Sequence, residues 1–167
     1  PLPRPGKLPT AHEINSLSTL FNQGKLDKAI RIAQQMSARY PQHEFAWKVL
    51  GAALMREGKP AEALPAMQQT AMLAPHDANA HYNLGVSLQE LGRLHEAADS
   101  YRRTLQIKPD YAQAHSNLGA ILYIICRTTG IYKRTAETYH DRIISIQCNK
   151  RQSMIIFNVY LYRIMPR

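Results

Sequence analysis

Three asparagines are the residues of this sequence whose type and spacing suggest recognition chemistry. Asn15, Asn83 and Asn117 are separated by multiples of 34 residues, and Val49 holds the one position between them. An asparagine side chain offers a carbonyl acceptor and an amide donor, which is the complement of a peptide bond. In register on one surface, such side chains could hold an extended peptide by its backbone. The alternative is that they are exposed polar residues that keep the surface soluble.

Catalytic and metal-binding patterns give no comparable signal. The stretch from His95 to Asp99 is near the helical zinc-protease motif, but Asp99 stands where the second histidine is required. Glu96 and Asp99 are expected instead on the solvent face of a helix. The sequence contains no glycine-rich phosphate loop and no G-x-S-x-G elbow. We therefore predict no catalytic residues, no cofactor and no metal.

The spacing of the asparagines belongs to an internal repeat. Four residue classes keep the same step of 34: Leu50-Gly51, Leu84-Gly85 and Leu118-Gly119; Pro41, Pro75 and Pro109; Gly24, Gly58 and Gly92; and Ala29, Ala63 and Ala97. Such agreement indicates repeated structural units.

Each period contains two helical patterns. Trp47, Leu50, Gly51 and Leu54 share one helix face, and a second apolar pattern includes Ala63, Leu64, Met67 and Ala71. Gly58 suits the left-handed turn between them, and Pro75 stops the second helix. We predict at least seven antiparallel helices, with turns near Gly24, Gly58 and Gly92.

Helix starts and close helix contacts are also predicted. Thr10 to Glu13 and Asp110 to Gln113 fit the capping box, and Asp77 is expected to cap the helix that follows it. Gly51, Gly85 and Gly119, with the alanines of the second helices, would let paired helices approach closely.

This pattern resembles the tetratricopeptide repeat (TPR) family, whose signature is Trp-x2-Leu-Gly-x2-Tyr, then Ala, an aromatic residue and Pro. It is present as Trp47-x2-Leu50-Gly51-x2-Leu54 with Ala63, Met67 and Pro75, and as His81-x2-Leu84-Gly85-x2-Leu88 with Ala97, Tyr101 and Pro109. The resemblance implies an all-α, right-handed superhelix (an α-solenoid). His81 and His115 hold the Trp47 position and are expected to be wedged in the core.

The resemblance covers residues 10–122. We expect a proline-rich linker at 1–9, repeats at 10–43, 44–77 and 78–111, and a fourth repeat that starts at 112. Within it the turn glycine, due at position 126, stands four residues late at Gly130. Residues 123–167 are therefore expected to be a degenerate fourth repeat with a basic cap or tail. A frame-shifted C-terminus is the alternative.

By resemblance to the family, positions 2, 5, 6, 9, 12 and 13 of each period face a concave groove. The candidate groove residues are Asn15, Phe45, Lys48, Val49, Asn79, Tyr82, Asn83, Val86, Gln89, Gln113, Ser116 and Asn117. A TPR subgroup grips acidic chaperone tails through a clamp of two Lys, two Asn and one Arg. Only Lys48 and Asn83 match it, while Ala52, Gln113 and Asn117 replace the other three. Without those cations, we do not expect this sequence to form the clamp.

Composition narrows the function classes further. The net charge of +9 lies mostly in the tail, which has 8 Lys/Arg against 2 Asp/Glu from Tyr123 onward. No nucleic-acid motif accompanies it, so we expect no specific nucleic-acid partner.

No apolar run reaches the length of roughly 20 residues needed to cross a membrane. Cys126 and Cys148 are expected to be reduced thiols of a cytoplasmic protein. Because the first residue is proline, we expect an internal fragment or a trimmed sequence.

The sequence therefore predicts a non-enzymatic module that binds a protein or an extended peptide in its groove. Two alternatives stay open. The wording of the repeats resembles bacterial TPR arrays related to O-linked N-acetylglucosamine transferases and TPR-linked sulfotransferases. The chain could therefore be the substrate-recognition arm of a larger transferase. It could also be an assembly scaffold that forms homodimers through the solenoid ends.

Overall fold

The computed structural model describes residues 8–128, and every regular element in that range is an α-helix. The helices are α1 (Ala11–Asn22), α2 (Leu26–Arg39), α3 (Glu44–Arg56), α4 (Pro60–Leu73), α5 (Ala78–Glu90), α6 (Leu94–Ile107) and α7 (Ala112–Thr128). The expected all-α helical repeat is confirmed, with seven helices in the described range.

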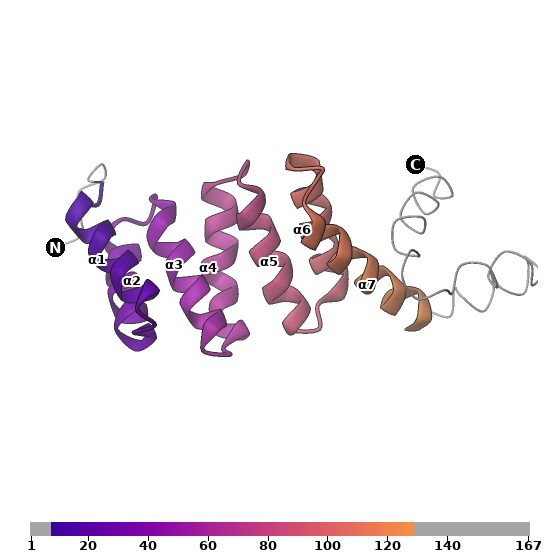
Figure 1. Ribbon diagram of the computed structural model, residues 1–167, viewed down its shortest axis with the longest axis horizontal. Helices are drawn as coiled ribbons and strands as arrows, with labels where there is room; N and C mark the ends of the chain where they lie inside the picture. Colours follow the sequence, from indigo (N-terminus) through magenta and orange to yellow (C-terminus); the bar gives the residue numbers. More distant parts are fainter. Residues whose placement is uncertain (1–7, 129–167) are drawn as a thin grey trace, which may run out of the picture. The chain divides into compact units, whose positions relative to one another are not determined.

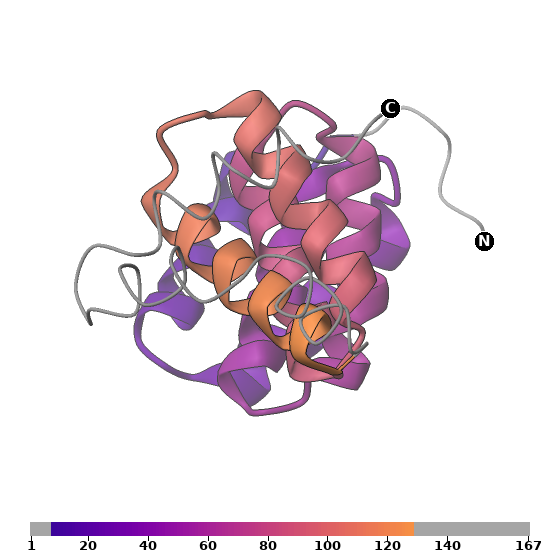
Figure 2. The same ribbon diagram turned by 90° about the vertical axis from the view of Figure 1, so that its right-hand side faces the viewer.

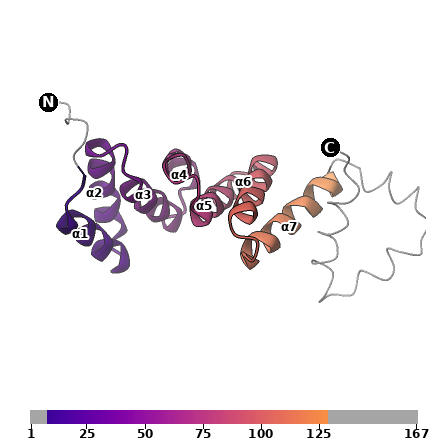
Figure 3. The same cartoon turned by 90° about the horizontal axis from the view of Figure 1, so that it is seen from above.

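The chain divides into two units, residues 1–109 and 110–167. In the first unit, α1 to α6 follow one another in chain order, and each packs against the next (Figure 1). Seen from above, α1, α3 and α5 alternate with α2, α4 and α6 (Figure 3). The view along the array shows these helices stacked one behind another (Figure 2). The second unit contributes α7, whose buried face carries Ala114, Leu118 and Ile121.

One turn geometry closes each of the three helix pairs. Gly24, Gly58 and Gly92 have φ of 71°, 72° and 71°, a left-handed conformation that favours glycine. The residue after each glycine donates its backbone N–H to a leucine carbonyl five residues earlier, for example Lys25 to Leu20 at 3.0 Å. This 6→1 bond is that of the Schellman motif, and it satisfies a carbonyl at the end of the helix.

Helix starts follow the sequence at two of three expected places. Thr10 and Glu13 form the capping box that begins α1. The Asp77 carboxylate accepts the Asn79 N–H at 2.8 Å and caps α5. The third prediction is wrong by one residue, because α7 begins at Ala112 and Tyr111 rather than Asp110 precedes it.

Glycine allows close helix pairing in the second and third repeats. A Cβ atom built on Gly51 would lie 2.9 Å from the Met67 sulfur, and one built on Gly85 would lie 2.7 Å from the Tyr101 ring. The second helix of each pair thus places its largest side chain over the glycine of the first. The predicted packing role of both glycines is confirmed.

Trp47 and His81 occupy equivalent positions and point at equivalent partners. The Trp47 indole N–H donates to the Pro41 carbonyl at 3.0 Å, and the His81 Nε2 lies 3.2 Å from the Pro75 carbonyl. His81 is half-buried, so its expected structural role fits this contact. His115 is exposed, so the prediction of a core position is wrong there.

The fourth repeat departs from the other three at its turn. Cys126 holds the register position of Gly24, Gly58 and Gly92, and α7 continues through it to Thr128. Without a glycine to leave the helix, the backbone keeps its helical conformation there. The expected slip at Gly130, the degenerate repeat or cap beyond residue 128 and most of the linker at 1–9 lie outside the described residues.

The two glycines should differ in their tolerance of a methyl group. Tyr101 is fully buried and its hydroxyl donates to Gln89, whereas the Met67 side chain is flexible and can turn aside. We expect Gly85→Ala to lower the free energy of unfolding by about 1–3 kcal/mol and Gly51→Ala to cost less. Urea unfolding of both variants measures this. Equal losses would mean that the neighbouring side chain does not set the cost.

The two prolines of α4 should have opposite effects. Pro65 lies inside the helix, is exposed and cannot donate to the Ala61 carbonyl. Pro60 is at the first helical position, where proline is favourable. We expect Pro65→Ala to raise the free energy of unfolding by about 1–2 kcal/mol, since part of the gain is offset by a more flexible unfolded chain. Pro60→Ala is the matched control and should not stabilise. Thermal melting measures the change in melting temperature of each variant. Equal changes in Pro65→Ala and Pro60→Ala would refute this account.

Candidate functional site

The first helices of neighbouring repeats pack directly on one another. Within residues 8–109, α3 contacts both α1 and α5, while no comparable packing joins α2 to α4 or α4 to α6. Helices that approach more closely lie on the inner side of a curved layer. We call the surface of α1, α3 and α5 around Asn15, Val49 and Asn83 the inner face.

The predicted groove residues occupy three first helices of the first unit and one of the second. Asn15 lies on α1; Phe45, Lys48 and Val49 on α3; Asn79, Tyr82, Asn83, Val86 and Gln89 on α5; and Gln113, Ser116 and Asn117 on α7. Most of them are exposed or half-buried, as a binding surface requires. Val49 is only 8% exposed and is part of the core. It therefore offers little surface to a ligand.

Lys48 is tied to the start of the next repeat. Its ammonium group lies 2.7 Å from the Asp77 carboxylate, which also caps α5. Burial raises the pKa of Asp77, but Lys48 and the backbone N–H groups of Asn79 and Ala80 outweigh it, so the net pKa is lowered. Lys48 thus links α3 to the start of α5 and has less charge to offer a ligand.

Tyr101 holds two residues of α5 in place from behind. Its hydroxyl donates to the Gln89 side-chain carbonyl at 2.9 Å, and its ring lies 5.7 Å from the Tyr82 ring. Because Tyr101 is fully buried, these contacts fix the orientation of Gln89 and Tyr82 relative to the core. A fixed side chain loses less conformational entropy when a ligand binds.

Asn15 and Asn83 are differently placed. Asn15 is exposed and Asn83 half-buried, and neither side-chain amide has a hydrogen-bond partner among the residues that the structure describes. Both amides can therefore form a complete pair of hydrogen bonds with a peptide group.

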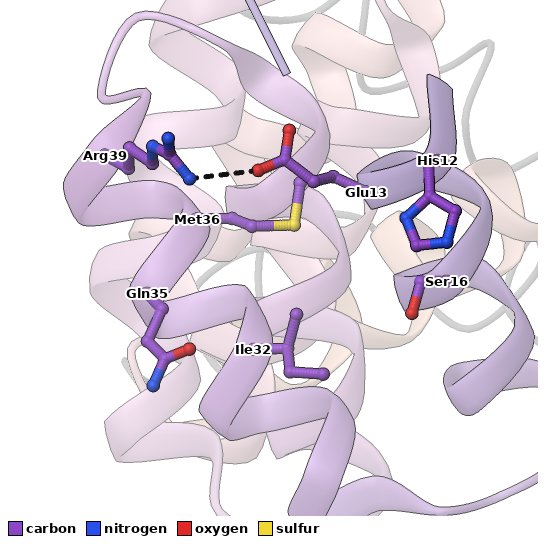
Figure 4. Close-up of a pocket in the computed structure, with 7 residues that line it drawn as sticks. All are labelled: His12, Glu13, Ser16, Ile32, Gln35, Met36 and Arg39. Atoms are coloured by element: carbon purple, nitrogen blue, oxygen red, sulfur yellow. Dashed lines mark hydrogen bonds and ion pairs between the residues drawn. The ribbon is translucent and has the colours of Figure 1, made fainter. Parts of the chain in front are cut away.

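An open hollow lies elsewhere in the described chain, between α1 and α2. It has a volume of about 290 Å³ and is lined by His12, Glu13, Ser16, Ile32, Gln35, Met36 and Arg39 (Figure 4). A neighbouring hollow of about 310 Å³ shares Ile32 and Gln35 and adds Leu20, Lys28 and Arg31. We call the two together the end hollow. Sequence reasoning missed it, because the first repeat was compared with the others only for its packing residues.

Glu13 is the acidic residue of the end hollow, and its carboxylate is fully engaged. It accepts from the Thr10 N–H at 2.8 Å, from the Tyr40 hydroxyl at 3.2 Å and from Arg39 at 3.2 Å. The Thr10 backbone and hydroxyl, then Tyr40 and Arg39, hold the pKa of Glu13 below its usual value. Burial and the Glu13 carboxylate raise the pKa of Tyr40.

The remaining sequence candidates take structural roles. Glu96 accepts two hydrogen bonds from Arg93 and Asp99 accepts one from Arg102, on exposed helix surface. Their expected place on a solvent face is confirmed. Within the described range, no group of three His, Cys, Asp or Glu residues could hold a metal ion. No helix in that range is long and apolar enough to cross a membrane.

Known proteins share this architecture. Residues 18–71 and 49–112 match the family model described as tetratricopeptide repeat. No curated protein sequence is significantly similar to the chain. Among solved structures, the first TPR of Spaghetti (RPAP3), bound to the HSP90 peptide SRMEEVD, has a TM-score of 0.66 and 23% identity over 72% of this chain and 99% of that chain.

Two further structures have the same likeness. MamA 41-end from Desulfovibrio magneticus RS-1 has a TM-score of 0.65 and 20% identity over 93% of this chain and 76% of that chain. The second TPR domain of human RPAP3, in complex with the HSP70 peptide SGPTIEEVD, has a TM-score of 0.62 and 24% identity over 65% and 91% of the two chains. At these identities, the likeness concerns the fold.

The Lys48–Asp77 pair should make stability depend on pH in a defined direction. A carboxyl with a lowered folded-state pKa stabilises the fold above its unfolded pKa, near 3.8, and loses that contribution as pH falls through the folded value. We expect Asp77→Asn, which keeps a capping oxygen, to cost about 1 kcal/mol at pH 7 and progressively less below pH 4.

Urea unfolding of both proteins at pH 7 and pH 3 measures this difference. Lys48→Gln should show the same trend, because it removes the other charge of the pair. A loss that stays constant with pH would show that the cap, and not the ion pair, carries the effect of Asp77.

Proposed function

Because this chain belongs to the tetratricopeptide repeat family, we propose that it is a protein-interaction module whose inner face binds an extended peptide. The observation that carries the proposal is the pair of side-chain amides of Asn15 and Asn83. Both lie on first helices of the array, and neither has a hydrogen-bond partner among the described residues.

The spacing of the two amides suits an extended chain. Packed helices lie about 8–10 Å apart, so two steps along the first helices cover roughly 20 Å. An extended peptide rises about 3.3 Å per residue, so about six residues join the two amides. Each amide would accept one backbone N–H and donate to one backbone carbonyl of the peptide.

Residues beside the asparagines supply the remaining contacts of the proposed site. Phe45 and Val86 offer apolar surface, and Tyr82 offers an aromatic ring backed by Tyr101. Gln113, Ser116 and Asn117 hold the same positions of the repeat on α7 of the second unit, where we propose a contact of the same kind. Contacts of this kind distinguish peptides mainly by backbone availability and less by side-chain charge.

The proposed ligand differs from an acidic chaperone tail. The two RPAP3 domains in the similar structures bind peptides that end in Glu-Glu-Val-Asp. In this chain Lys48 already pairs with Asp77, and Gln113 and Asn117 bring no cation. A tail rich in carboxylates would lack its charged partners here, so we propose a ligand of low net charge.

Replacement of the asparagines should weaken peptide binding without loss of stability. Each neutral hydrogen-bonded contact is worth about 0.5–1.5 kcal/mol net, so Asn83→Ala with Asn117→Ala should lower affinity roughly 5- to 150-fold. Asn15→Ala should weaken binding further. A screen of extended peptides against the full chain, followed by titration of the best binder, measures the effect.

Two controls separate backbone recognition from other causes. Gln68→Ala removes an exposed amide from α4, a second helix, and should leave affinity unchanged. Methylation of the peptide's backbone amides should weaken binding more than replacement of its side chains. An affinity that the asparagine substitutions leave unchanged would refute the proposed groove. Competition by the acidic peptide SRMEEVD through its charge alone would refute it as well.

A further inference from the structure

The end hollow is built from repeat positions that are buried elsewhere in the array. Ala46, Leu54, Ala66 and Thr70 of the second repeat are at most 4% exposed, as are Ala80, Leu88 and Thr104 of the third. In the first repeat the same positions carry His12, Leu20, Ile32 and Met36, of which His12 is exposed and Leu20 and Ile32 are half-buried.

The array itself shows what covers these positions in the interior. The α2 helix packs on α3 and the α4 helix packs on α5, so each later repeat receives the second helix of the one before it. Residues of α2 and α3 form one core cluster that also takes in Ala63 and Ala66 of α4. By the same geometry, the end hollow is shaped to receive a helix.

Charge distinguishes the end hollow from its interior equivalents. Lys28 stands where the later repeats have Glu62 and Glu96, and Arg31 stands where they have Pro65 and Asp99. Arg39 replaces Leu73 and Ile107. The three cations are exposed, and the acidic residue of the hollow, Glu13, is taken up by Thr10, Tyr40 and Arg39.

We propose that the end hollow binds an acidic amphipathic helix of a partner protein. Its apolar side chains would cover Leu20 and Ile32, beside the buried Met36, and its carboxylates would pair with Lys28, Arg31 and Arg39, whose guanidinium group also binds Glu13. The three cations span positions 28 to 39 of one helix, and at 1.5 Å per residue this is roughly 16 Å. A partner of about three turns, with carboxylates at both ends of its apolar stripe, matches that length.

Charge argues against the neighbouring segment of the chain as the occupant. Residues 1–7 carry Arg4 and Lys7 and no acidic residue, so they do not complement Lys28 and Arg31. A second copy of the chain is the other occupant to separate by experiment. The proposal concerns a different surface from the inner face and does not depend on it.

A labelled peptide tests the proposal on the full chain. The probe is a designed helix of about five turns, with leucines on one stripe and glutamates on both flanks. Fluorescence anisotropy should show saturable binding. Lys28→Glu with Arg31→Asp, the residue types of the third repeat, should weaken it about tenfold or more. Ile32→Ser should also weaken it, because the hollow loses apolar contact area.

Matched controls make each outcome decisive. Arg102→Glu with Arg103→Asp changes the same number of charges on α6 and should leave binding unchanged. A peptide of the same composition with scrambled order should bind poorly, and circular dichroism melting confirms that each variant folds. If both charge variants lose the same affinity, or if the scrambled peptide binds equally well, the binding depends only on net charge and the proposal is overturned.

A further measurement separates the second copy. Static light scattering over a range of concentrations should give the mass of one chain for both the unmodified protein and Lys28→Glu with Arg31→Asp. If the unmodified protein is a dimer and Lys28→Glu with Arg31→Asp dissociates it, the occupant of the end hollow is another copy of the chain and the proposal is overturned. Asn83→Ala should weaken peptide binding at the inner face and leave helix binding at the end hollow unchanged. Each proposal can therefore be refuted without the other.

Discussion

The array depends on one contact between the two helices of each repeat, where the side chains must share a fixed volume. In the second and third repeats glycine faces a large residue, Gly51 against Met67 and Gly85 against Tyr101. In the first repeat the order is reversed, because Leu17 and Ala33 hold the same two positions and both are fully buried. A core at crystal-like density tolerates either order, provided that the total volume stays about the same.

This contact also determines how the surfaces are presented. A close approach of the two helices leaves the first helices free to pack on one another, as α3 does with α1 and α5. Tyr101 fills the space over Gly85 and reaches Gln89 and Tyr82 from the core side. The same ring thus sets the helix distance and orients two residues of the inner face.

The repeat period made the fold predictable, since it fixed the helices, the turns at Gly24, Gly58 and Gly92 and the cap at Asp77. It did not reveal which side chains find partners inside the molecule. Equivalent positions share a place in the helix but not the same neighbours, so Asn83 and Val49 differ in exposure. The Lys48–Asp77 pair links α3 to the residue that caps α5, a contact that periodicity does not indicate. The predictions for His115 and for the start of α7 were wrong, since His115 is exposed and α7 begins one residue later than expected.

The two candidate surfaces follow from the two ways in which a repeat differs from its copies. At the inner face asparagine recurs at one position of the first, third and fourth repeats, where the second repeat has the buried Val49. At the end hollow the copies disagree, because Lys28 and Arg31 replace acidic residues or proline at the edge of the hollow. The equivalent residues Glu62, Glu96 and Asp99 are exposed, so these positions stay in contact with solvent along the array and what changes in the first repeat is the sign of the charge. Beside the half-buried Leu20 and Ile32, this change of sign gives the end hollow a surface that is apolar at its centre and positive at its edge.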